Sequence, residues 1–341
     1  MSEDTNLSCC HGPLVSIALA TYNGARFLRE QLDSICDQTW TTMEILVGDD
    51  RSTDGTVEIL TEYRQKCGLY LEINDETLGV IKNFGRIISR CRGEYIALAD
   101  QDDVWRPEKI EKIVKILEAS PDVGYVFTDA ELVGEDLRTL HRFLWETIGF
   151  DGNLRAGFFR GEQVRTYLRK QVVTGATMVF RATLLDAVLP LPVSHKWLHD
   201  GWIALVASSI GAPGVALAEP LILYRQHEAQ QIGAVEDVQL DLPARRLRHD
   251  RIRCTNALEF AETAGSYASL VERLRSLPRA NEATRSTLLL LDEARRHQLA
   301  RSRIYKSGIL FRSILVMVEL ISGRYGKFSN SCKSALIDLW G

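Results

Sequence analysis

The chain lacks several patterns that would assign it directly to a class of protein. No stretch reaches about 20 uninterrupted apolar residues, so we expect no membrane-spanning helix. The seven cysteines are odd in number and form no Cys-x-x-Cys pair, so neither a disulfide framework nor a zinc site is expected. No charged segment followed by an apolar one opens the chain, so we expect no secretory leader and a cytoplasmic location.

An excess of basic residues is missing as well. The net charge is −4 at pH 7, so the composition offers no argument for nucleic acid as a partner, and none is expected. Carboxylates gather at residues 49–54 and 100–103, whereas cations gather at 245–253 and 295–306. A length of 341 residues allows one large domain with a sizeable appendage.

The first half of the chain alternates β-rich and helical segments. Strands are expected at Val15–Ala20, Glu44–Gly48, Leu69–Ile73, Tyr95–Ala99 and Gly124–Thr128, with helices at Ala25–Cys36, Asp54–Lys66, Val80–Cys91 and Pro107–Ala119. We expect Asp54 to be the N-cap of its helix. This alternation predicts an α/β fold whose sheet is largely parallel, with right-handed crossovers.

The second half is less regular. The segment Asp136–Lys170 is polar, contains scattered aromatic residues and has no clear periodicity. A strand at Thr177–Phe180, helices at 182–188 and 200–210 and an extended segment at 214–224 are expected after it. Beyond residue 237 the chain becomes charged and helical.

The segment Gly93–Asp103 carries the strongest indication of chemistry. The apolar run Tyr95–Ala99 is typical of a buried strand, and three carboxylates follow it, those of Asp100, Asp102 and Asp103. Crowded carboxylates repel one another, so a cation or hydrogen-bond donors must offset their charge. Mg²⁺ prefers oxygen ligands and often shares carboxylates with substrate phosphates. The segment therefore predicts a metal–diphosphate site, with a solvated acidic loop as the alternative.

Polar residues also follow the first and second predicted strands, as Thr21-Tyr22-Asn23 and Asp49-Asp50. In a parallel sheet these groups and the aspartate cluster project from the same edge, so they can meet around one ligand. Asp49 or Asp50 could accept a hydrogen bond from a nucleobase imide, and Tyr22 offers a ring face for stacking. No Gly-x-Gly-x-x-Gly follows the first strand, which disfavours a dinucleotide-dependent oxidoreductase.

These motifs together resemble those of family-two glycosyltransferases with the GT-A fold. They are Thr-Tyr-Asn at 21–23, Gly-Asp-Asp-Arg-Ser-Thr-Asp-Gly-Thr at 48–56, Leu-Gly-Val-Ile-Lys-Asn-Phe at 78–84 and Ala-Asp-Gln-Asp-Asp-Val-Trp at 99–105. The last motif resembles the bacterial rhamnosyltransferase-like branch. The resemblance implies a flexible tail over residues 1–13, a single Rossmann-like nucleotide-sugar-binding domain with a mixed central sheet over 14–236, and a helical C-terminal extension over 237–341.

The resemblance also implies roles for the residues that match the motifs of the family. Asp200 matches the catalytic base, Asp102 the direct metal ligand, and His227 a residue that reaches the metal or the diphosphate. Donor-binding positions are Thr21, Tyr22, Asn23, Asp49, Asp50, Lys82, Asn83, Asp100 and Gln101, and the loop lining the sugar and acceptor contributes Thr174, Gly175 and Trp202. The chain departs from many relatives at Arg51, where they have glycine, and at His199, where they have glutamate before the base.

The implied activity is the metal-dependent, inverting transfer of a sugar, rhamnose by the branch resemblance, from a dTDP- or UDP-sugar with Mn²⁺ or Mg²⁺. The implied acceptor is a hydroxyl of a lipid-linked or growing surface polysaccharide, such as O-antigen, at the inner face of the bacterial plasma membrane. Asp200 also fits on chemical grounds, because inverting transfer needs one carboxylate to take the acceptor's proton. An N-cap role for Asp200 is the structural alternative, and a non-catalytic nucleotide-sugar-binding assembly or sensor protein is the functional one.

The segment Ile309–Ile321 is the most apolar part of the C-terminal extension. Arg312 and Glu319 interrupt it and lie seven residues apart, so they share one face of a helix. Basic residues flank the segment on both sides. A helix in the membrane interface fits this pattern, and so does a core or homodimer helix; both interpretations stay open.

Overall fold

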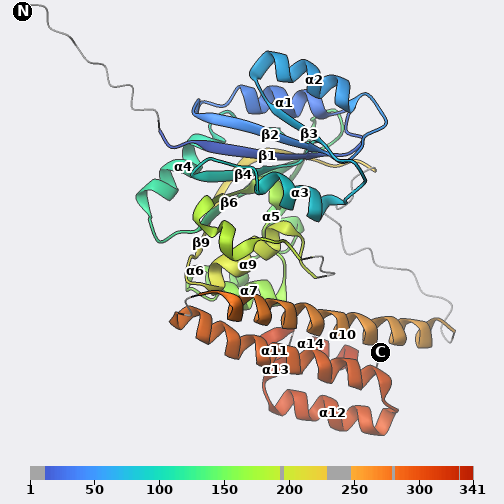
Figure 1. The fold of residues 1–341 in the computed structure, drawn as a ribbon. Helices are drawn as coiled ribbons and strands as arrows, with labels where there is room; N and C mark the ends of the chain where they lie inside the picture. The colour runs from blue at the N-terminus through green and yellow to red at the C-terminus, as the bar shows by residue number, and fades with distance from the viewer. Residues whose placement is uncertain (1–11, 193–195, 229–246, 279–280, 330, 341) are drawn as a thin grey trace, which may run out of the picture.

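The computed structural model describes residues 12–192, 196–228, 247–278, 281–329 and 331–340. A sheet with helices on both faces forms the upper part of the molecule in Figure 1, and the C-terminal helices lie below it. Most of the expected tail at 1–13, and the expected domain boundary at 236–237, fall outside the described residues.

In the described residues, nine strands form one sheet. They are β1 (Val15–Thr21), β2 (Met43–Asp49), β3 (Tyr70–Ile73), β4 (Tyr95–Ala99), β5 (Val104–Trp105), β6 (Tyr125–Val133), β7 (Thr139–Phe143), β8 (Met178–Arg181) and β9 (Gly214–Arg225). The order is β3-β2-β1-β4-β8-β6-β9-β5, with β7 paired to β6. The first four strands are parallel, as the alternation predicts, whereas β8 runs antiparallel between β4 and β6. The sheet is therefore mixed, and the carboxyl ends of β1, β2 and β4 share one edge.

The helices cover both faces of this sheet and form the C-terminal group (Figure 1). They are α1 (Leu28–Cys36), α2 (Thr56–Cys67), α3 (Val80–Ile88), α4 (Lys109–Ala119), α5 (Leu144–Thr147), α6 (Gly152–Phe159), α7 (Gln163–Arg169), α8 (Leu185–Val188), α9 (His199–Ser209), α10 (Leu247–Ser276), α11 (Glu282–Lys306), α12 (Ile309–Ile321), α13 (Arg324–Phe328) and α14 (Ser331–Trp340), with short 3-10 turns η1 (Gly175–Thr177) and η2 (Ala182–Leu184).

One local expectation is wrong, and one segment for which the sequence predicts no structure is ordered. Asp54 is not the N-cap residue, because α2 begins at Thr56 and Gly55 precedes it; the Asp54 carboxylate nevertheless accepts hydrogen bonds from the Thr56 N–H and hydroxyl. The segment 136–170, which has no clear periodicity, forms β7 and α5 to α7. Its aromatic rings pack around Phe127 of β6, so long-range packing rather than a local pattern gives the segment its structure.

Alternating side chains of β1 enter two cores on opposite faces of the sheet. Val15, Ile17 and Leu19 pack with α1, α2 and α4, whereas Ala18 faces the core formed with α3 and α9. This is the two-residue period of a strand buried on both faces.

The second core continues into the C-terminal helices. Tyr267 and Leu270 of α10 and Leu291 of α11 are completely buried in it. The Tyr267 hydroxyl donates to the Leu168 carbonyl, and the Arg273 guanidinium donates to the Ala187 carbonyl at 2.7 Å. In the described residues, therefore, the helical extension and the sheet share one apolar core.

Candidate active site

A cavity of about 810 Å³ lies at the carboxyl edge of the sheet, where β1 and β4 end. This size suits a ligand as large as a nucleotide with a sugar attached. The polar side chains that line it come from the strand ends, α3, the segment before α9, α9 itself and the segment after β9. They include Asp50, Asn83, Asp100, Gln101, Asp102, Lys196, His199, Asp200 and His227.

The cavity brings together residues that lie far apart in the chain. Asp102, Asp200 and His227 all line it, although 125 residues separate Asp102 from His227. The expected convergence of the strand ends on one crevice is thus present in the structure. The assigned roles of these residues remain proposals.

Asp102 and His227 are direct neighbours. The His227 Nε2 atom lies 2.8 Å from Asp102 Oδ2, and both side chains are largely buried. The backbone there is held by Arg225, whose Nε–H donates to the Asp102 carbonyl and whose N–H donates to the Asp103 carboxylate. The aspartate cluster is therefore largely buried and hydrogen-bonded to Arg225, contrary to the alternative of a solvated acidic loop.

Asp100 lies in a strongly anionic environment. Burial, followed by the charges of Asp102 and Asp200, raises the pKa of Asp100 to about 7, and Lys109 opposes the rise. Lys109 is itself buried, which lowers its pKa, and its Nζ donates to the Ala176 carbonyl at 2.7 Å. The carboxyl groups of Asp100, Asp102 and Asp200 thus act on one another at the cavity wall.

Asp200 lies in the first turn of α9, two positions after the N-cap residue Leu198, so the N-cap interpretation is wrong. Its Oδ1 atom accepts from Gln171 Nε2 at 2.8 Å and from the Gly201 N–H at 2.6 Å. These two donors hold the carboxylate in one orientation toward the cavity. Gln171, which also lines the cavity, was not expected as a site residue, and no sequence pattern marks it.

The loop after β1 is locked to the aspartate loop. Gln101 Oε1 accepts from the Tyr22 N–H at 2.8 Å, and Gln101 Nε2 donates to the Tyr22 carbonyl at 3.0 Å. Gly24 makes this approach feasible, because a Cβ there would lie 2.2 Å from Gln101 Oε1. The Asn23 side chain accepts from the Thr53 N–H. Tyr22 is 43% exposed, so its ring can contact a ligand.

The two adjacent aspartates after β2 differ in placement. Asp49 is fully buried, does not line the cavity, and accepts from the Ser52 N–H, the Ser52 hydroxyl and Thr21. Asp50 does line the cavity, while it accepts from Asn74 and from two backbone N–H groups. The geometry therefore makes Asp50, not Asp49, the carboxylate that can face a ligand.

Two further residues do not line the cavity. Lys82 is exposed on α3. Trp202 is buried, with its indole N–H donating to the Val188 carbonyl at 2.9 Å, so it has a packing role. Three other positions expected in the site, Asn83, Thr174 and Gly175, do line the cavity.

Lys196 and His199 are cavity-lining residues that had no assigned role. Burial lowers the pKa of Lys196 to about 8. The His199 ring stacks on Phe84 at 3.9 Å between centroids, and neither of its buried ring nitrogens has a hydrogen-bond partner in the described residues. Gly175 leaves room for this ring, since a Cβ there would lie 2.7 Å from His199 Nε2.

The residues present suit a divalent cation that a diphosphate helps to hold. In the described part of the chain, no group of three or more histidine, cysteine or acidic side chains is arranged to bind a metal alone. Asp102 and His227 nevertheless offer an oxygen and a nitrogen side by side. Mg²⁺ commonly takes one or two carboxylates and completes its shell with substrate phosphates. The donor set and the neighbouring Asp100 and Asp200 carboxyl groups fit such an ion.

Comparison with known proteins identifies the class. Residues 16–189, slightly more than half of the chain, match the model of glycosyl transferase family 2, so the chain belongs to that family. The first solved structure compared, S. aureus TarS residues 1–349 in complex with UDP-GlcNAc, matches with a TM-score of 0.54 at 14% identity, over 94% of this chain and 90% of that one. The mannosyltransferase PcManGT from Pyrobaculum calidifontis, in complex with GDP-Man and Mn²⁺, gives 0.52 at 18% identity, over 96% and 86%. The fold is therefore α/β of the GT-A type, with a mixed sheet and C-terminal helices.

The curated relatives match over part of their length. The chain is 28% identical over 231 residues to the dTDP-rhamnosyl transferase RfbG of Shigella flexneri, covering 63% of this chain and 74% of that protein. It is 29% identical over 146 residues to the putative teichuronic acid biosynthesis glycosyltransferase TuaG of Bacillus subtilis, covering 42% and 58%. An uncharacterized Mycobacterium tuberculosis protein is 29% identical over 220 residues, and the match spans 59% of its length and 62% of this chain.

Proposed function

We propose that this chain is a metal-dependent, inverting glycosyltransferase that moves a sugar from a nucleoside diphosphate to an acceptor hydroxyl. The observation that carries the proposal is that Asp100, Asp102 and Asp200 line one cavity at the carboxyl edge of the sheet. Membership of glycosyl transferase family 2 supports the same reaction class.

The donor would lie along the ends of β1, β2 and β4. Tyr22 can stack on the base, and Asp50 can accept from its imide N–H because a carboxylate offers about four acceptor positions and three are in use. Asp102 and His227 would hold the diphosphate through a divalent cation, Mn²⁺ or Mg²⁺. When bound, that cation would stabilise the negative charge that grows on the departing diphosphate.

Asp200 would act as the general base. It takes the proton of the acceptor hydroxyl while the hydroxyl oxygen forms its bond to the anomeric carbon and the diphosphate departs. Gln171 and the Gly201 N–H keep the carboxylate in place during this step. Inversion follows from a single displacement, since no second carboxylate is needed as a nucleophile.

For the sugar we propose rhamnose from a dTDP donor, with UDP-sugars as the second candidates. The aspartate motif and the similarity to the RfbG protein favour rhamnose, and the similarity to TuaG favours a surface polysaccharide as the product. The acceptor would then be a lipid-linked or growing glycan at the inner face of the bacterial plasma membrane.

A thermal-shift screen of nucleotide sugars, with and without Mn²⁺ or Mg²⁺, tests the proposal. One donor should raise the melting temperature only when metal is present, and Asp102→Ala should abolish that increase. Asp200→Asn should preserve it but lower turnover by about 10² to 10⁴-fold.

Two outcomes would contradict the assignment. Near wild-type turnover by Asp200→Asn would place the base elsewhere. Donor binding without turnover by the wild-type chain, for every acceptor class tried, would favour the binding-only alternative. Lys115→Gln, on the exposed face of α4 outside the cavity, is the control and should leave both the donor-induced thermal shift and the turnover unchanged.

A further inference from the structure

Helix α12 packs with the opposite orientation to an ordinary surface helix. Arg312, Val316 and Glu319 are its buried side chains, whereas Leu310 is 83% and Ile321 is 81% exposed. A surface helix normally turns its apolar stripe to the core and its charged face to water. Here the charged face is turned inward.

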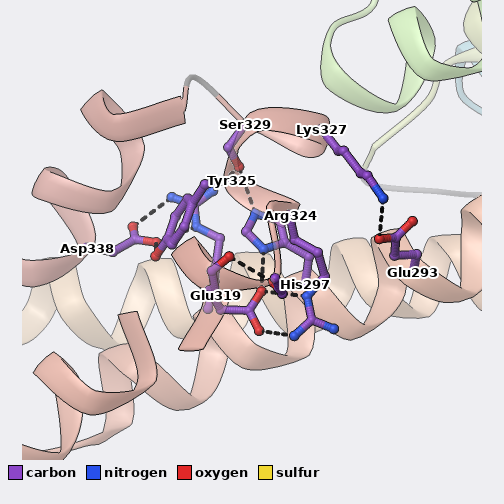
Figure 2. Close-up of polar contacts among 10 residues, drawn as sticks. Glu293, His297, Glu319, Arg324, Tyr325, Lys327, Ser329 and Asp338 are labelled. Atoms are coloured by element: carbon purple, nitrogen blue, oxygen red, sulfur yellow. Dashed lines mark hydrogen bonds and ion pairs between the residues drawn. The ribbon is translucent and has the colours of Figure 1, made fainter. Parts of the chain in front are cut away.

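Ion pairs inside the C-terminal group explain the orientation. Glu319 accepts from Arg324, and its Oε2 atom lies 2.8 Å from His297 Nδ1 of α11; Figure 2 shows Glu319 between these two partners. The other imidazole nitrogen, Nε2, lies 2.9 Å from the Ser329 hydroxyl. Because the buried face is fixed by charge-assisted bonds, the apolar face must point away from the protein.

The exposed apolar face is continuous along the helix. We define it as the exposed side chains of α12 at helical spacing, which are Leu310, Phe311, Ile314, Met317, Val318 and Ile321. At about 100° per residue they fall within an arc of roughly 120°. Leu336, Ile337 and Trp340 add exposed apolar area on α14, which packs against α12. A contiguous apolar surface of this kind marks a binding surface.

The exposed charges on this stretch of the chain have one sign. From Ser302 to Trp340 the chain has two side-chain carboxylates, Glu319 and Asp338, and both are buried. The exposed ionic groups of the same described stretch are cations, among them Arg303, Lys306 and Lys333. An apolar face on a stretch of chain whose own exposed charges are all cations is complementary to an anionic lipid surface.

A second copy of this chain fits the same face less well. A symmetric dimer through the face would bring the same cations toward each other without exposed carboxylates of this stretch to pair with them. Spanning a bilayer is also excluded for the described helices, since none is long and apolar enough. Helix α12, with 13 residues, is about 20 Å long and suits a position parallel to the surface.

We infer that the exposed apolar face of α12, extended by α14, docks on an anionic lipid bilayer and inserts shallowly into its interface. This surface lies on the C-terminal helices, at the opposite end of the molecule from the sheet in Figure 1. None of its residues lines the active-site cavity. The inference is therefore independent of the chemistry proposed above.

Flotation of the full chain with vesicles tests the inference. Binding to vesicles with about one third phosphatidylglycerol should be at least tenfold stronger than binding to pure phosphatidylcholine vesicles. Each cation near the surface adds a several-fold preference for anionic lipid. The double variant Phe311→Ser/Ile321→Ser should lower binding to the anionic vesicles by about 100-fold. Lys306→Gln/Lys333→Gln should remove the preference for anionic lipid.

The matched control is Leu289→Ser, which removes an exposed leucine (76%) from α11 outside the face and should leave flotation unchanged. Donor-induced thermal shifts should be the same in every variant, which separates this test from that of the proposed activity. The substituted side chains are exposed, so the melting temperature of each variant should stay close to that of the wild type.

A second measurement leaves the side chains of α12 unchanged. Trp340 is 72% exposed, whereas the other five tryptophans are buried or half-buried. Brominated acyl chains should quench the fluorescence of the wild-type protein more than that of Trp340→Phe. Three results would each overturn the inference. The wild-type protein fails to float with anionic vesicles, or Leu289→Ser loses as much vesicle binding as Phe311→Ser/Ile321→Ser does. The third is a dimer of the wild-type chain that Phe311→Ser/Ile321→Ser dissociates while vesicle binding persists.

Discussion

Two buried histidines show how the same residue type serves different purposes in this chain. His297 is completely buried, and both of its ring nitrogens have partners, Glu319 and Ser329. His199 is also buried, at 5% exposure, but its nitrogens have no partner in the described residues and it lines the cavity. Burial lowers the pKa of His199, so the neutral ring is favoured there. A neutral imidazole can both donate to and accept from a sugar hydroxyl.

Replacing His199 by phenylalanine should therefore separate stability from activity. The His199→Phe ring can keep the stacking on Phe84 and removes two unpartnered polar atoms, so the free energy of unfolding should stay within about 1 kcal/mol of wild type or rise. The kcat/KM for the donor or acceptor should fall about tenfold through the lost hydrogen bond. Urea unfolding and steady-state kinetics measure the two effects.

His297→Phe is the matched control, and it should behave in the opposite way. It leaves the Glu319 carboxylate buried with one partner fewer, which costs about 3 kcal/mol of stability. Its kinetic constants should be unchanged at temperatures where it stays folded. An unaltered kcat/KM in His199→Phe would show that the ring only fills space.

At the scale of elements, the C-terminal helices are held together by buried ionic groups as well as by apolar packing. The Asp338 carboxylate of α14 is fully buried and accepts from Arg301 Nε at 2.6 Å and from the Tyr325 hydroxyl at 2.6 Å. Tyr305 donates to it as well, at 3.1 Å. Figure 2 shows Asp338 and Tyr325 facing each other within this group. One carboxylate thus joins α11, α13 and α14.

Asp338→Asn should lower the free energy of unfolding by about 3 kcal/mol, because it removes the charge that the largely buried Arg301 requires. Asp292→Asn provides the comparison, since Asp292 pairs with Arg296 on the exposed side of α11 and should lose less than about 0.5 kcal/mol. Chemical denaturation of both full-length variants gives the two values. Equal losses would show that the buried pair contributes no more than a surface pair.

At the scale of the whole molecule, the sheet and the C-terminal helices depend on one another. Tyr267, Leu270, Leu274 and Leu291 are completely buried in the core that also holds α3 and α9. Each such side chain contributes about 1.5–3 kcal/mol through burial. Their sum is comparable to the total stability of an ordinary domain.

A chain that ends at Glu228 should therefore fail to fold stably, even though it retains every residue of the cavity. We expect low solubility and no cooperative thermal transition, whereas the full chain should unfold cooperatively. Differential scanning calorimetry of both chains, with circular dichroism of the shortened one, checks this expectation. A cooperative transition at the melting temperature of the full chain would contradict it.

The sequence by itself determined the alternating strands and helices, the α/β class and the edge of the sheet that carries the site. These features follow from local periodicity and from the geometry of parallel strands, in which Tyr95–Ala99 must deliver Asp100 and Asp102 to the same edge as Thr21. The family motifs lie within this same region. The sequence predicts a strand at Thr177–Phe180, where β8 lies, but its antiparallel position between β4 and β6 has no local signal. Its partners lie about 80 residues (β4) and about 50 residues (β6) earlier in the chain.

Only the tertiary structure decided which of several plausible side chains face the cavity. Asp49 points into the protein because Thr21 and Ser52 bind it, so Asp50 faces the site instead. The exposed apolar face of α12 has the same kind of origin. Glu319 meets His297, 22 residues earlier in the chain, and that contact turns the charged side of the helix inward. Hydrophobic periodicity predicts which residues share a face of a helix. Contacts with residues distant in the sequence determine whether that face packs inward or is exposed.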